Sequence, residues 1–453
     1  MKYITPLNSL LLASIIPQVW SWEVGNGVQT SSGFVHGHAA SNTFVSEYLG
    51  IPYAQPPIGE LRFAAPQKYI EKTSINGADF GYSCPIASTY SSLVSPEVHS
   101  DLNFTAADCL TLNIWTKPQT GEKRKAVLVW FPGGGFVAGS PHSSGYNGQQ
   151  FADKEDFVIV SVSYRLNIFG FPGNPMGDNN LGLLDQRAAV QWVHDNIKYF
   201  GGDPARITIF GESAGGASVD LYSYAFVSNP LVAGFIAQSG TTQLQPPINA
   251  SSSADLNFIP TIDDTIVFSD YTSRSLAGNF IKYPMLIGHN DAEGNIFSLI
   301  AQMKGITLPE TYWSSYETST FFCPAAIRAN VSVHNHLPIW RYRYFGDFPD
   351  MQLRENIDSG AYHGAEIYPL FGNTPSGVGI PKRTVREVDL GRYMMKAWAT
   401  FAKDPHRGLR KLDWPIFSPG EDTLIRLGFR NITALDLSGS AEYDAGCPSA
   451  FPV

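Results

Sequence analysis

The stretch Arg206-Ile-Thr-Ile-Phe-Gly-Glu-Ser-Ala-Gly-Gly216 decides the fold of this chain. It begins with a short apolar run that predicts a buried strand, and it passes through glycines straight into a segment of helical character. The turn from strand to helix is so tight that side chains would collide there, which explains Gly211, Gly215 and Gly216. The turn is therefore predicted to present the hydroxyl of Ser213 in the open, at the positive end of a helix.

Further runs of β-branched and aromatic residues predict a sheet around this strand. Between two of them, Leu183 to Phe200 carries apolar residues at helical spacing and stops at Gly201-Gly202. Strands that alternate with helices indicate an α/β fold, with a mostly parallel sheet covered on both faces and functional loops at the carboxyl ends of its strands. The predicted strands are Ala126–Phe131, Phe157–Tyr164, Arg206–Phe210, Gly234–Gln238, Pro284–Gly288 and Ile339–Tyr344.

A second glycine-rich stretch, Pro132-Gly-Gly-Gly-Phe136, follows the first of these strands. Three consecutive glycines let bare backbone N–H groups face a ligand. The carbonyl oxygen of an ester becomes an anion as a tetrahedral intermediate forms, and such preorganised donors stabilise it. The alternative is an ordinary flexible loop.

The composition excludes two classes of protein. Hydrophobic residues make up 43% of the 453 residues and charged residues only 16%, so the chain buries a large core and is not a disordered protein. The formal net charge of -9 argues against a nucleic-acid partner, because phosphate contacts need clustered Lys and Arg. The longest basic run is Lys123-Arg124-Lys125.

Residues 1–21 are predicted to be a secretory signal peptide, followed by one domain over residues 22–453. Lys2 supplies the positive start and Leu10–Ile16 the apolar stretch, while Val19 and Ser21 occupy the minus-three and minus-one positions of a plausible cut before Trp22. A membrane anchor is the weaker alternative because Pro17-Gln18 interrupts the apolar run, and no later segment is predicted to span a membrane. The protein is therefore predicted to be secreted.

Sequons and cysteines agree with export. Cysteines are even in number, which allows two disulfides in three possible pairings, and the absence of a Cys-x-x-Cys spacing makes metal ligation the weaker reading. The cysteines are Cys84, Cys109, Cys323 and Cys447, and the candidate glycosylation sites are Asn103, Asn249, Asn330 and Asn431.

Seven segments, in this order, resemble the type B carboxylesterase/lipase family, the cholinesterase-like branch of the α/β-hydrolases, and most of all its secreted fungal members. The resemblance implies an α/β-hydrolase fold. The matching segments are Tyr48–Pro57, Asp108–Asn113, Trp130–Phe136, Asn180–Gln186, Phe210–Gly216, Gln238–Gly240 and Tyr362–Glu366.

The resemblance also implies a catalytic triad, in which Ser213 is the nucleophile, Glu293 the acid and His363 the base. Asp291 is a local rival for the acid, two residues before Glu293. The order Ser…Glu…His is the order that an α/β-hydrolase requires. Such a triad works through an acyl-enzyme and needs neither a metal nor an organic cofactor. Activity is expected to fall at acid pH as His363 gains a proton, at about pH 6 to 7 for an ordinary histidine.

Further roles follow from the same resemblance. It implies a disulfide between Cys84 and Cys109, which leaves Cys323 and Cys447 as a second possible pair. Glu212 and Ser239 are expected to steady the histidine and its acid. The backbone donors of the oxyanion hole are expected to be Gly134, Gly135 and Ala214.

The chain departs from the family in its spacing. Ser213 and Glu293 are 80 residues apart, and Glu293 and His363 are 70 apart. Both intervals are shorter than is usual for the family, which predicts a shortened cap region. Two explanations remain open, a compact member of the family or a chain that has lost a segment.

The sequence thus predicts a secreted serine carboxylic ester hydrolase that acts on small-molecule esters; it assigns no oligomeric state. The loop Pro85–Asp108 is only modestly apolar, whereas the lid of an interfacial lipase should be amphipathic. An interfacial triacylglycerol lipase is accordingly the first alternative. The second is a catalytically inactive, cholinesterase-like binding or adhesion protein, or a truncated relic.

Overall fold

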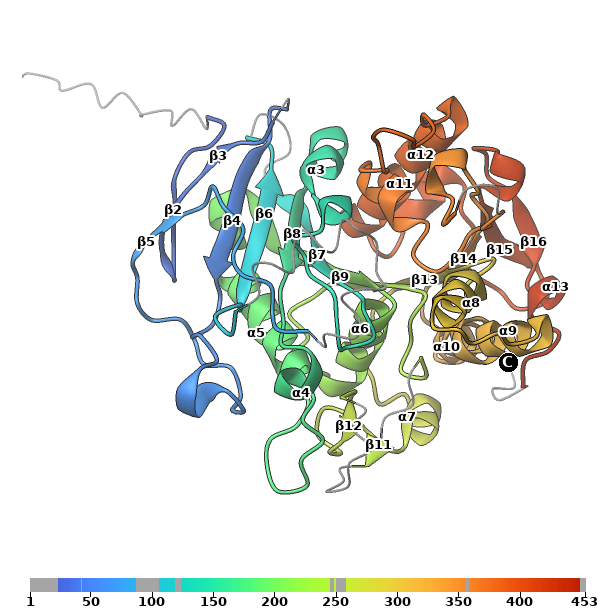
Figure 1. Ribbon diagram of the computed structural model, residues 1–453, viewed down its shortest axis with the longest axis horizontal. Coiled ribbons are helices and arrows are strands. Elements are labelled where there is room, and N and C mark those ends of the chain that lie inside the picture. Colours follow the sequence, from blue (N-terminus) through green and yellow to red (C-terminus); the bar gives the residue numbers. More distant parts are fainter. Residues whose placement is uncertain are drawn as a thin grey trace, which may run out of the picture.

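The computed structural model describes residues 23–41, 43–86, 106–118, 124–244, 248–249, 258–354 and 358–448. The predicted signal peptide, residues 1–21, and the sequon at Asn103 lie outside these ranges. Within them, an eleven-stranded sheet crosses the whole molecule, from the blue strands to the red ones in Figure 1. In sheet order its strands are β16 (Leu437–Gly439), β15 (Asp422–Leu427), β14 (Ile339–Tyr344), β13 (Met285–Asn290), β10 (Gly234–Gln238), β9 (Gly202–Glu212), β7 (Lys125–Phe131), β8 (Val158–Val162), β6 (Thr111–Thr116), β4 (Ser46–Pro52) and β3 (His38–Ala39).

The sheet is mostly parallel, as the sequence predicts. Neighbouring strands run parallel from β8 through to β15, and only the two edges are antiparallel. All six predicted strands are present, and β10 and β14 have the predicted bounds. The predicted helix after β8 is α5 (Leu181–Asn196), extended by a 3-10 turn, η3 (Ile197–Phe200).

Both faces of the sheet are covered by helices. Along β7 the side chains alternate, so that Val127 and Val129 enter one apolar cluster while Leu128 and Trp130 enter another. The first cluster includes residues of α5, α6 (Ala214–Ala225) and α10 (Cys323–His334); the second includes residues of α3 (Gln149–Glu155), α11 (Ile367–Phe371) and α12 (Val385–Lys403). Figure 1 shows these two sets on opposite sides of the sheet. The α/β-hydrolase prediction is confirmed at this level.

The region expected to form a cap lies between β10 and β14. Its helices are α7 (Tyr271–Ala277), α8 (Gly294–Met303), α9 (Glu310–Glu317), a π-helical turn η4 (Thr318–Phe322) and α10. Although the connections are short, β10, β13 and β14 remain hydrogen-bonded neighbours. The sheet is therefore continuous across these short connections.

The remaining elements are small and lie around this framework. One further sheet joins β1 (Val28–Thr30), β2 (Gly33–His36) and β5 (Ser74–Asn76), and another pairs β11 (Ile248–Asn249) with β12 (Thr261–Ile262). The short helices are η1 (Gly59–Leu61), η2 (Ser144–Tyr146), α4 (Asn167–Gly170), η5 (Pro349–Met351), η6 (Gly408–Leu412), η7 (Phe429–Asn431) and α13 (Ala441–Asp444).

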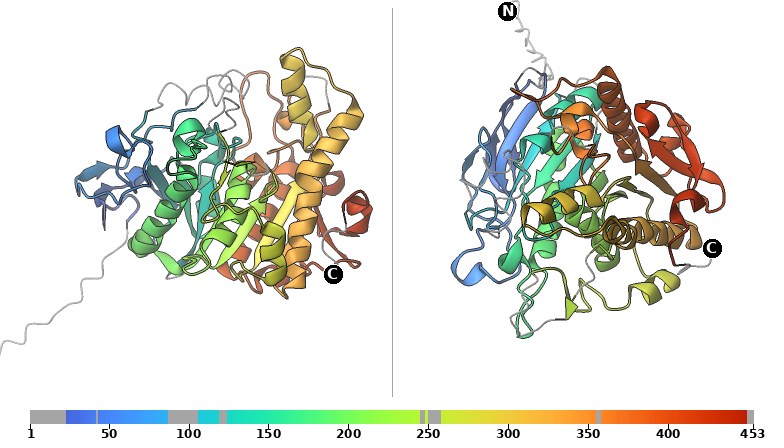
Figure 2. Two further views of the ribbon diagram at one scale, coloured as in Figure 1. Left: turned by 90° about the horizontal axis from the view of Figure 1, so that it is seen from below. Right: turned by 45° about the vertical axis from the view of Figure 1, so that its right-hand side comes forward.

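Two disulfides tie distant parts of the chain together. Cys84 and Cys109 are bonded with their Cα atoms 5.1 Å apart. Cys323 at the start of α10 is bonded to Cys447, 124 residues later. In Figure 2 the yellow and orange helices α8 to α10 accordingly lie at the end of the molecule that carries the C-terminal elements. No helix in the described part of the chain has the length and apolarity needed to cross a bilayer.

Candidate active site

Ser213 occupies the sharp turn between β9 and α6. Its backbone has φ 57° and ψ -123°, a conformation that costs energy for any residue with a Cβ atom. The surrounding glycines are obligatory because a Cβ atom at Gly215 would lie 1.9 Å from the carbonyl oxygen of Phe131. Within residues 211–220, Ser213 is the only residue that is not buried. The turn therefore presents its hydroxyl as the sequence predicts.

Glu293 follows β13 and is fully buried. Its Oε1 accepts hydrogen bonds from the hydroxyl of Ser239 at 2.6 Å and from the backbone N–H of Asn290 at 2.7 Å. Its Oε2 lies 2.5 Å from Nδ1 of His363. The rival acid, Asp291, pairs with Nε of Arg343 instead, at 2.7 Å. The structure thus brings Glu293, and not Asp291, to the histidine.

His363 is held between two carboxylates. Its Nδ1 faces Glu293, and its Nε2 lies 3.0 Å from Oε1 of Glu212, the residue before Ser213. Only 11% of the His363 side chain is exposed. Among the described residues, Ser213 Oγ makes no hydrogen bond to His363, whose Nε2 lies instead beside Glu212. The structure therefore brings Glu293 and His363 together, and it places the imidazole next to the residue that precedes Ser213.

The carboxylates change the acidity of the imidazole. Burial lowers the pKa of His363, but Glu212 and Glu293 together outweigh burial and raise that pKa to about 9. Burial also raises the pKa of the Glu212 carboxyl to about 8, and the charge of His363 opposes this rise. The imidazole therefore holds its proton more firmly than an ordinary histidine does.

The glycine loop Pro132–Phe136 presses directly against the turn that carries Ser213. A Cβ atom at Gly133 would lie 2.8 Å from the carbonyl oxygen of Glu212 and 3.0 Å from Cβ of Ser213. Gly134 and Gly135 adopt positive φ values of 117° and 62°. No carbonyl within the described residues accepts from the N–H of either glycine, so both donors remain free for a ligand.

A third buried carboxylate, Glu366, was not predicted to take part in the site. Its Oε1 accepts from the side-chain amide of Gln238 at 3.0 Å, and its Oε2 accepts from that of Asn290 at 2.6 Å. Burial raises the pKa of this carboxyl as well. Asn290 also donates its backbone N–H to Glu293, so Glu366 helps to fix the loop that carries the acid. The sequence signal that could have found it is its place in the segment Tyr362–Glu366, three residues after His363.

Two aromatic rings flank the histidine, and sequence reasoning missed both. The ring centroids of Phe297, on α8, and Phe321, in the π-helical turn, lie 5.1 Å and 4.8 Å from that of His363. π-Helical turns are rare and are frequent at functional sites. Both rings belong to an apolar cluster that also contains Ala214 and Phe136. The imidazole therefore borders an apolar wall, and no residue spacing in the sequence signals it.

The candidate glycosylation sites differ in their surroundings. Asn330 is partly exposed on α10, and Asn249 ends β11. Asn431 exchanges two hydrogen bonds with the backbone of Asp347, donating its amide at 2.6 Å and accepting at 3.0 Å.

Comparison with known proteins finds relatives that agree with the family resemblance of the sequence. A model of the carboxylesterase family matches residues 25–249. Chlorogenic acid esterase of Aspergillus niger is 32% identical over 464 residues, covering 88% of this chain and 89% of that protein. Acetylcholinesterase of Bungarus fasciatus is 39% identical over 507 residues, covering 88% and 82%.

A fungal relative is longer than this chain. Secreted lipase 5 of Gibberella zeae is 28% identical over 556 aligned residues, covering 99% of this chain and 100% of the lipase. Because this chain has only 453 residues, the lipase contains residues with no counterpart here.

A solved structure of a thermophilic PNB esterase agrees in fold. It superimposes with a TM-score of 0.77 at 25% identity, and the match covers 93% of this chain and 99% of the esterase. With the identity and coverage above, these findings show that the chain belongs to the carboxylesterase family and is a carboxylic ester hydrolase.

Proposed function

We propose that this protein hydrolyses carboxylic esters through a Ser213–His363–Glu293 triad and an acyl-enzyme intermediate. The observation that carries the proposal is the position of His363, whose Nδ1 is bound by Glu293 while its Nε2 faces the turn of Ser213. A carboxylate on Nδ1 selects the tautomer whose Nε2 can accept a proton, and it stabilises the imidazolium that forms.

The chemical steps follow from these positions. Nε2 of His363 leaves Glu212 and takes the proton of Ser213 as Oγ attacks the ester carbonyl. The backbone N–H groups of Gly134, Gly135 and Ala214 stabilise the negative oxygen of the tetrahedral intermediate. The histidine then returns the proton to the leaving alcohol, and water hydrolyses the acyl-enzyme by the same route.

The proposed substrates are small soluble esters with an apolar or aromatic group next to the reacting carbon. Phe297 and Phe321 form an apolar wall at the histidine, and aromatic rings pack well on aromatic rings. A relative named chlorogenic acid esterase agrees with this choice. An interfacial lipase is the second candidate, because one relative is named as a secreted lipase.

We further propose that the protein is exported through residues 1–21. Two disulfides support this, since disulfides persist in oxidising compartments and are rare in the cytosol. The secreted relative from Gibberella zeae supports it as well. An inactive binding protein or relic is less well supported. Such a chain has no need to keep Glu293 hydrogen-bonded to Ser239 and Asn290 and paired with His363.

Covalent labelling tests the mechanism. A fluorophosphonate probe is expected to label the protein, and Ser213→Ala is expected to abolish both labelling and hydrolysis of p-nitrophenyl esters. A series of these esters with acyl chains of increasing length, measured below and above the solubility limit, separates the two substrate classes. A jump in rate on droplets would favour the lipase. A folded protein that neither labels nor hydrolyses any ester would favour the inactive binding protein.

A further inference from the structure

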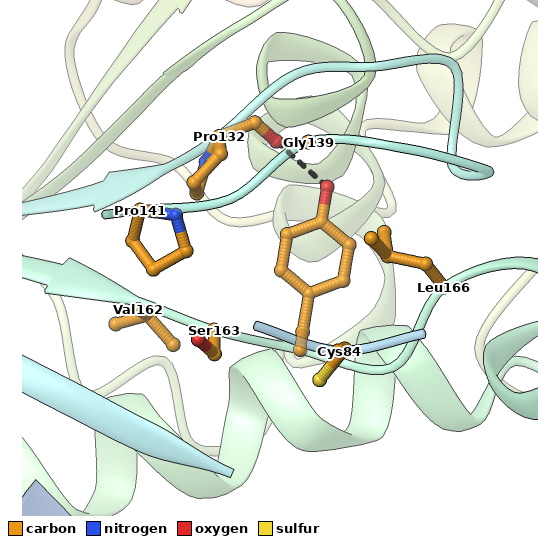
Figure 3. Close-up of a pocket in the computed structure, with 8 residues that line it drawn as sticks. Cys84, Pro132, Gly139, Pro141, Val162, Ser163 and Leu166 are labelled. Atoms are coloured by element: carbon orange, nitrogen blue, oxygen red, sulfur yellow. Dashed lines mark hydrogen bonds between the residues drawn. The ribbon is translucent and has the colours of Figure 1, made fainter. Parts of the chain in front are cut away.

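The glycine loop Pro132–Phe136 is held at both ends by a single segment of the chain, Tyr164–Asn167, which follows β8. The hydroxyl of Tyr164 donates a hydrogen bond of 2.7 Å to the carbonyl oxygen of Pro132 (Figure 3). The backbone N–H of Asn167 donates a bond of 2.8 Å to the carbonyl oxygen of Phe136. The two free donors, Gly134 and Gly135, lie between these anchored residues.

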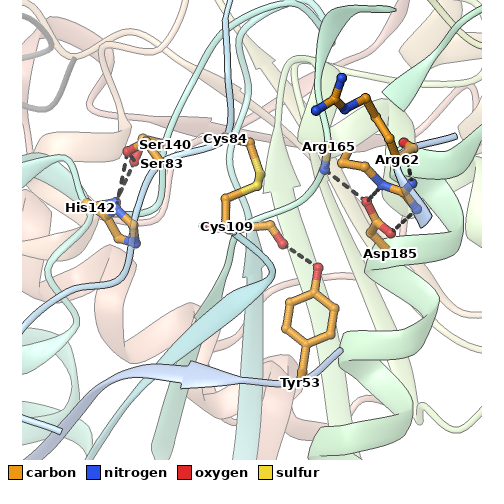
Figure 4. Close-up of a disulfide and its surroundings, with 10 residues drawn as sticks. Tyr53, Arg62, Ser83, Cys84, Cys109, Ser140, His142, Arg165 and Asp185 are labelled. Atoms are coloured by element: carbon orange, nitrogen blue, oxygen red, sulfur yellow. Dashed lines mark hydrogen bonds and ion pairs between the residues drawn. A yellow bond between two sulfur atoms is a disulfide. The ribbon is translucent and has the colours of Figure 1, made fainter. Parts of the chain in front are cut away.

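That segment is itself firmly fixed. The guanidinium of Arg165 is buried and pairs with the fully buried carboxylate of Asp185 on α5, with bonds of 2.8 Å and 2.7 Å. The backbone N–H of Arg165 donates to the same carboxylate at 3.0 Å. A further guanidinium nitrogen donates to the carbonyl of Ala64 at 2.8 Å. Figure 4 shows this pair next to the disulfide of Cys84 and Cys109. Tyr164 is therefore attached to a backbone segment that is held in place by a buried ion pair and hydrogen bonds.

The loop borders a small pocket next to Tyr164. The pocket is lined by Pro132, Gly139, Leu166 and their neighbours, and its volume of about 10 Å³ is roughly enough for one water molecule (Figure 3). Gly133, the next residue of the loop, already touches the turn of Ser213. Loss of the bond to Pro132 would leave its buried carbonyl without this partner, so the loop is expected to shift at this end and to carry Gly134 and Gly135 with it.

The Tyr164 hydroxyl acts only as a hydrogen-bond donor. Burial, and after it the charge of Glu212, raise the pKa of Tyr164 well above its usual value, so the proton stays in place. Its one oxygen is already committed to Pro132. It therefore takes no part in proton transfer and influences the reaction only through the loop.

We infer that Tyr164 is a positioning residue for ester hydrolysis, because its bond to the carbonyl of Pro132 holds the N–H groups of Gly134 and Gly135 where the oxyanion forms. The inference rests on the proposed function of these two donors. Preorganised donors are effective only at hydrogen-bond distance from the oxyanion, and a misplacement of about 1 Å can cost about 10²-fold in rate. Such a defect reduces the stabilisation of the transition state more than it reduces the binding of the ester.

The test uses Tyr164→Phe with Tyr53→Phe as its matched control. Tyr53 is equally buried, and its hydroxyl also donates 2.7 Å to a backbone carbonyl, that of Ser163, but it does not contact the glycine loop. Each variant loses one buried hydroxyl–carbonyl bond in the same part of the molecule. Equal decreases in melting temperature would show that both variants fold and lose the same kind of bond.

Tyr164→Phe is expected to lower kcat about 5- to 50-fold with KM nearly unchanged, short of the roughly 10²–10³-fold cost of losing a donor outright. A trifluoromethyl ketone, whose adduct with serine carries an oxyanion, is expected to bind more weakly by a similar factor. Tyr53→Phe is expected to leave kcat and inhibitor affinity within about twofold.

Two outcomes would overturn the inference, and they are distinguishable. Equal kcat and equal inhibitor affinity in the two variants would exclude a positioning role for Tyr164 and leave the triad intact. Failure of the fluorophosphonate probe to label the unmodified protein would remove the serine mechanism, and the inference with it.

Discussion

Nδ1 of His363 lies 2.5 Å from Oε2 of Glu293, and the two residues are 70 positions apart in the chain. The other carboxylate oxygen accepts hydrogen bonds from Ser239 and Asn290, so these two residues hold the orientation of Glu293 independently of the histidine.

Replacing the acid tests the triad directly. Glu293→Gln keeps the shape of the side chain but removes the charge that stabilises the imidazolium, so kcat is expected to fall by about 10⁴-fold. Asp291→Asn is the matched control, since Asp291 is partly exposed and pairs with the buried guanidinium of Arg343 rather than with the histidine. It is expected to change kcat less than about twofold, because Asp291 makes no hydrogen bond to the imidazole that takes the serine proton. The reverse ranking in steady-state kinetics would assign the acid to Asp291.

The pH profile is expected to reflect the two carboxylates at the imidazole. Since Glu212 and Glu293 outweigh burial and raise the pKa of His363 from 6.5 to about 9, the histidine stays protonated to higher pH than usual. Only the neutral imidazole accepts the serine proton, so kcat/KM is expected to rise with pH through this pKa. This moves the acid limb above the value of about 6 to 7 expected for an ordinary histidine.

Glu212→Gln provides the control for that profile. The neutral amide no longer raises the pKa of His363, so the acid limb of kcat/KM is expected to move to lower pH. Measurements from pH 5 to 10 on both proteins would show the shift. An unchanged midpoint would mean that Glu212 is not ionised when the histidine titrates.

The glycine loop is expected to tolerate no side chain at Gly134. Its φ is 117°, and a Cβ atom would lie 2.3 Å from the carbonyl oxygen of Ala138, so Gly134→Ala displaces the loop. The expected loss in kcat is about 10²–10³-fold, the cost of an oxyanion donor. Gly305→Ala is the control, because Gly305 also has a positive φ, of 76°, with nothing within 4 Å. Equal activity of the two variants would remove Gly134 from the oxyanion hole.

The stability of the framework beneath the site depends on Asp185. Asp185→Asn leaves the guanidinium of Arg165 buried without its counter-charge, and the free energy of unfolding is expected to fall by about 3–5 kcal/mol. Asp270→Asn removes a partner of Arg274 from an exposed i,i+4 pair and is expected to cost at most about 0.5 kcal/mol. Urea unfolding of both variants measures the difference. Similar losses of unfolding free energy in the two variants would mean that Arg165 finds other partners when Asp185 is replaced.

Local patterns were enough to predict the elements that carry the site. The strand–turn–helix at Ser213 follows from glycine spacing and an apolar run, and these act over a few residues. Six strands are predictable for the same reason, since each contains a short run rich in β-branched and aromatic residues. The bounds of β9 were less predictable, because it begins at Gly202, among polar residues that show no strand pattern.

Contacts between distant segments were not predictable from local patterns. The family resemblance favours Glu293 over Asp291, but the residues themselves do not show that Asp291, on the loop after β13, pairs with Arg343 of β14. Glu366 and Phe321 reach the site from different segments of the chain, and no sequence pattern identifies the residues that they contact. The raised pKa of His363 likewise depends on charges from two other segments.

The chain by itself determined an α/β sheet, a serine on a strained turn and a glycine loop ahead of it, because each depends on neighbouring residues and on backbone freedom. Tertiary structure alone decided which carboxylate binds His363, which rings line it and which hydroxyl holds the glycine loop. The physical reason is distance. Hydrogen bonds and ring contacts act over a few ångströms, and only the folded sheet brings residues 132, 164, 213, 293 and 363 within that reach.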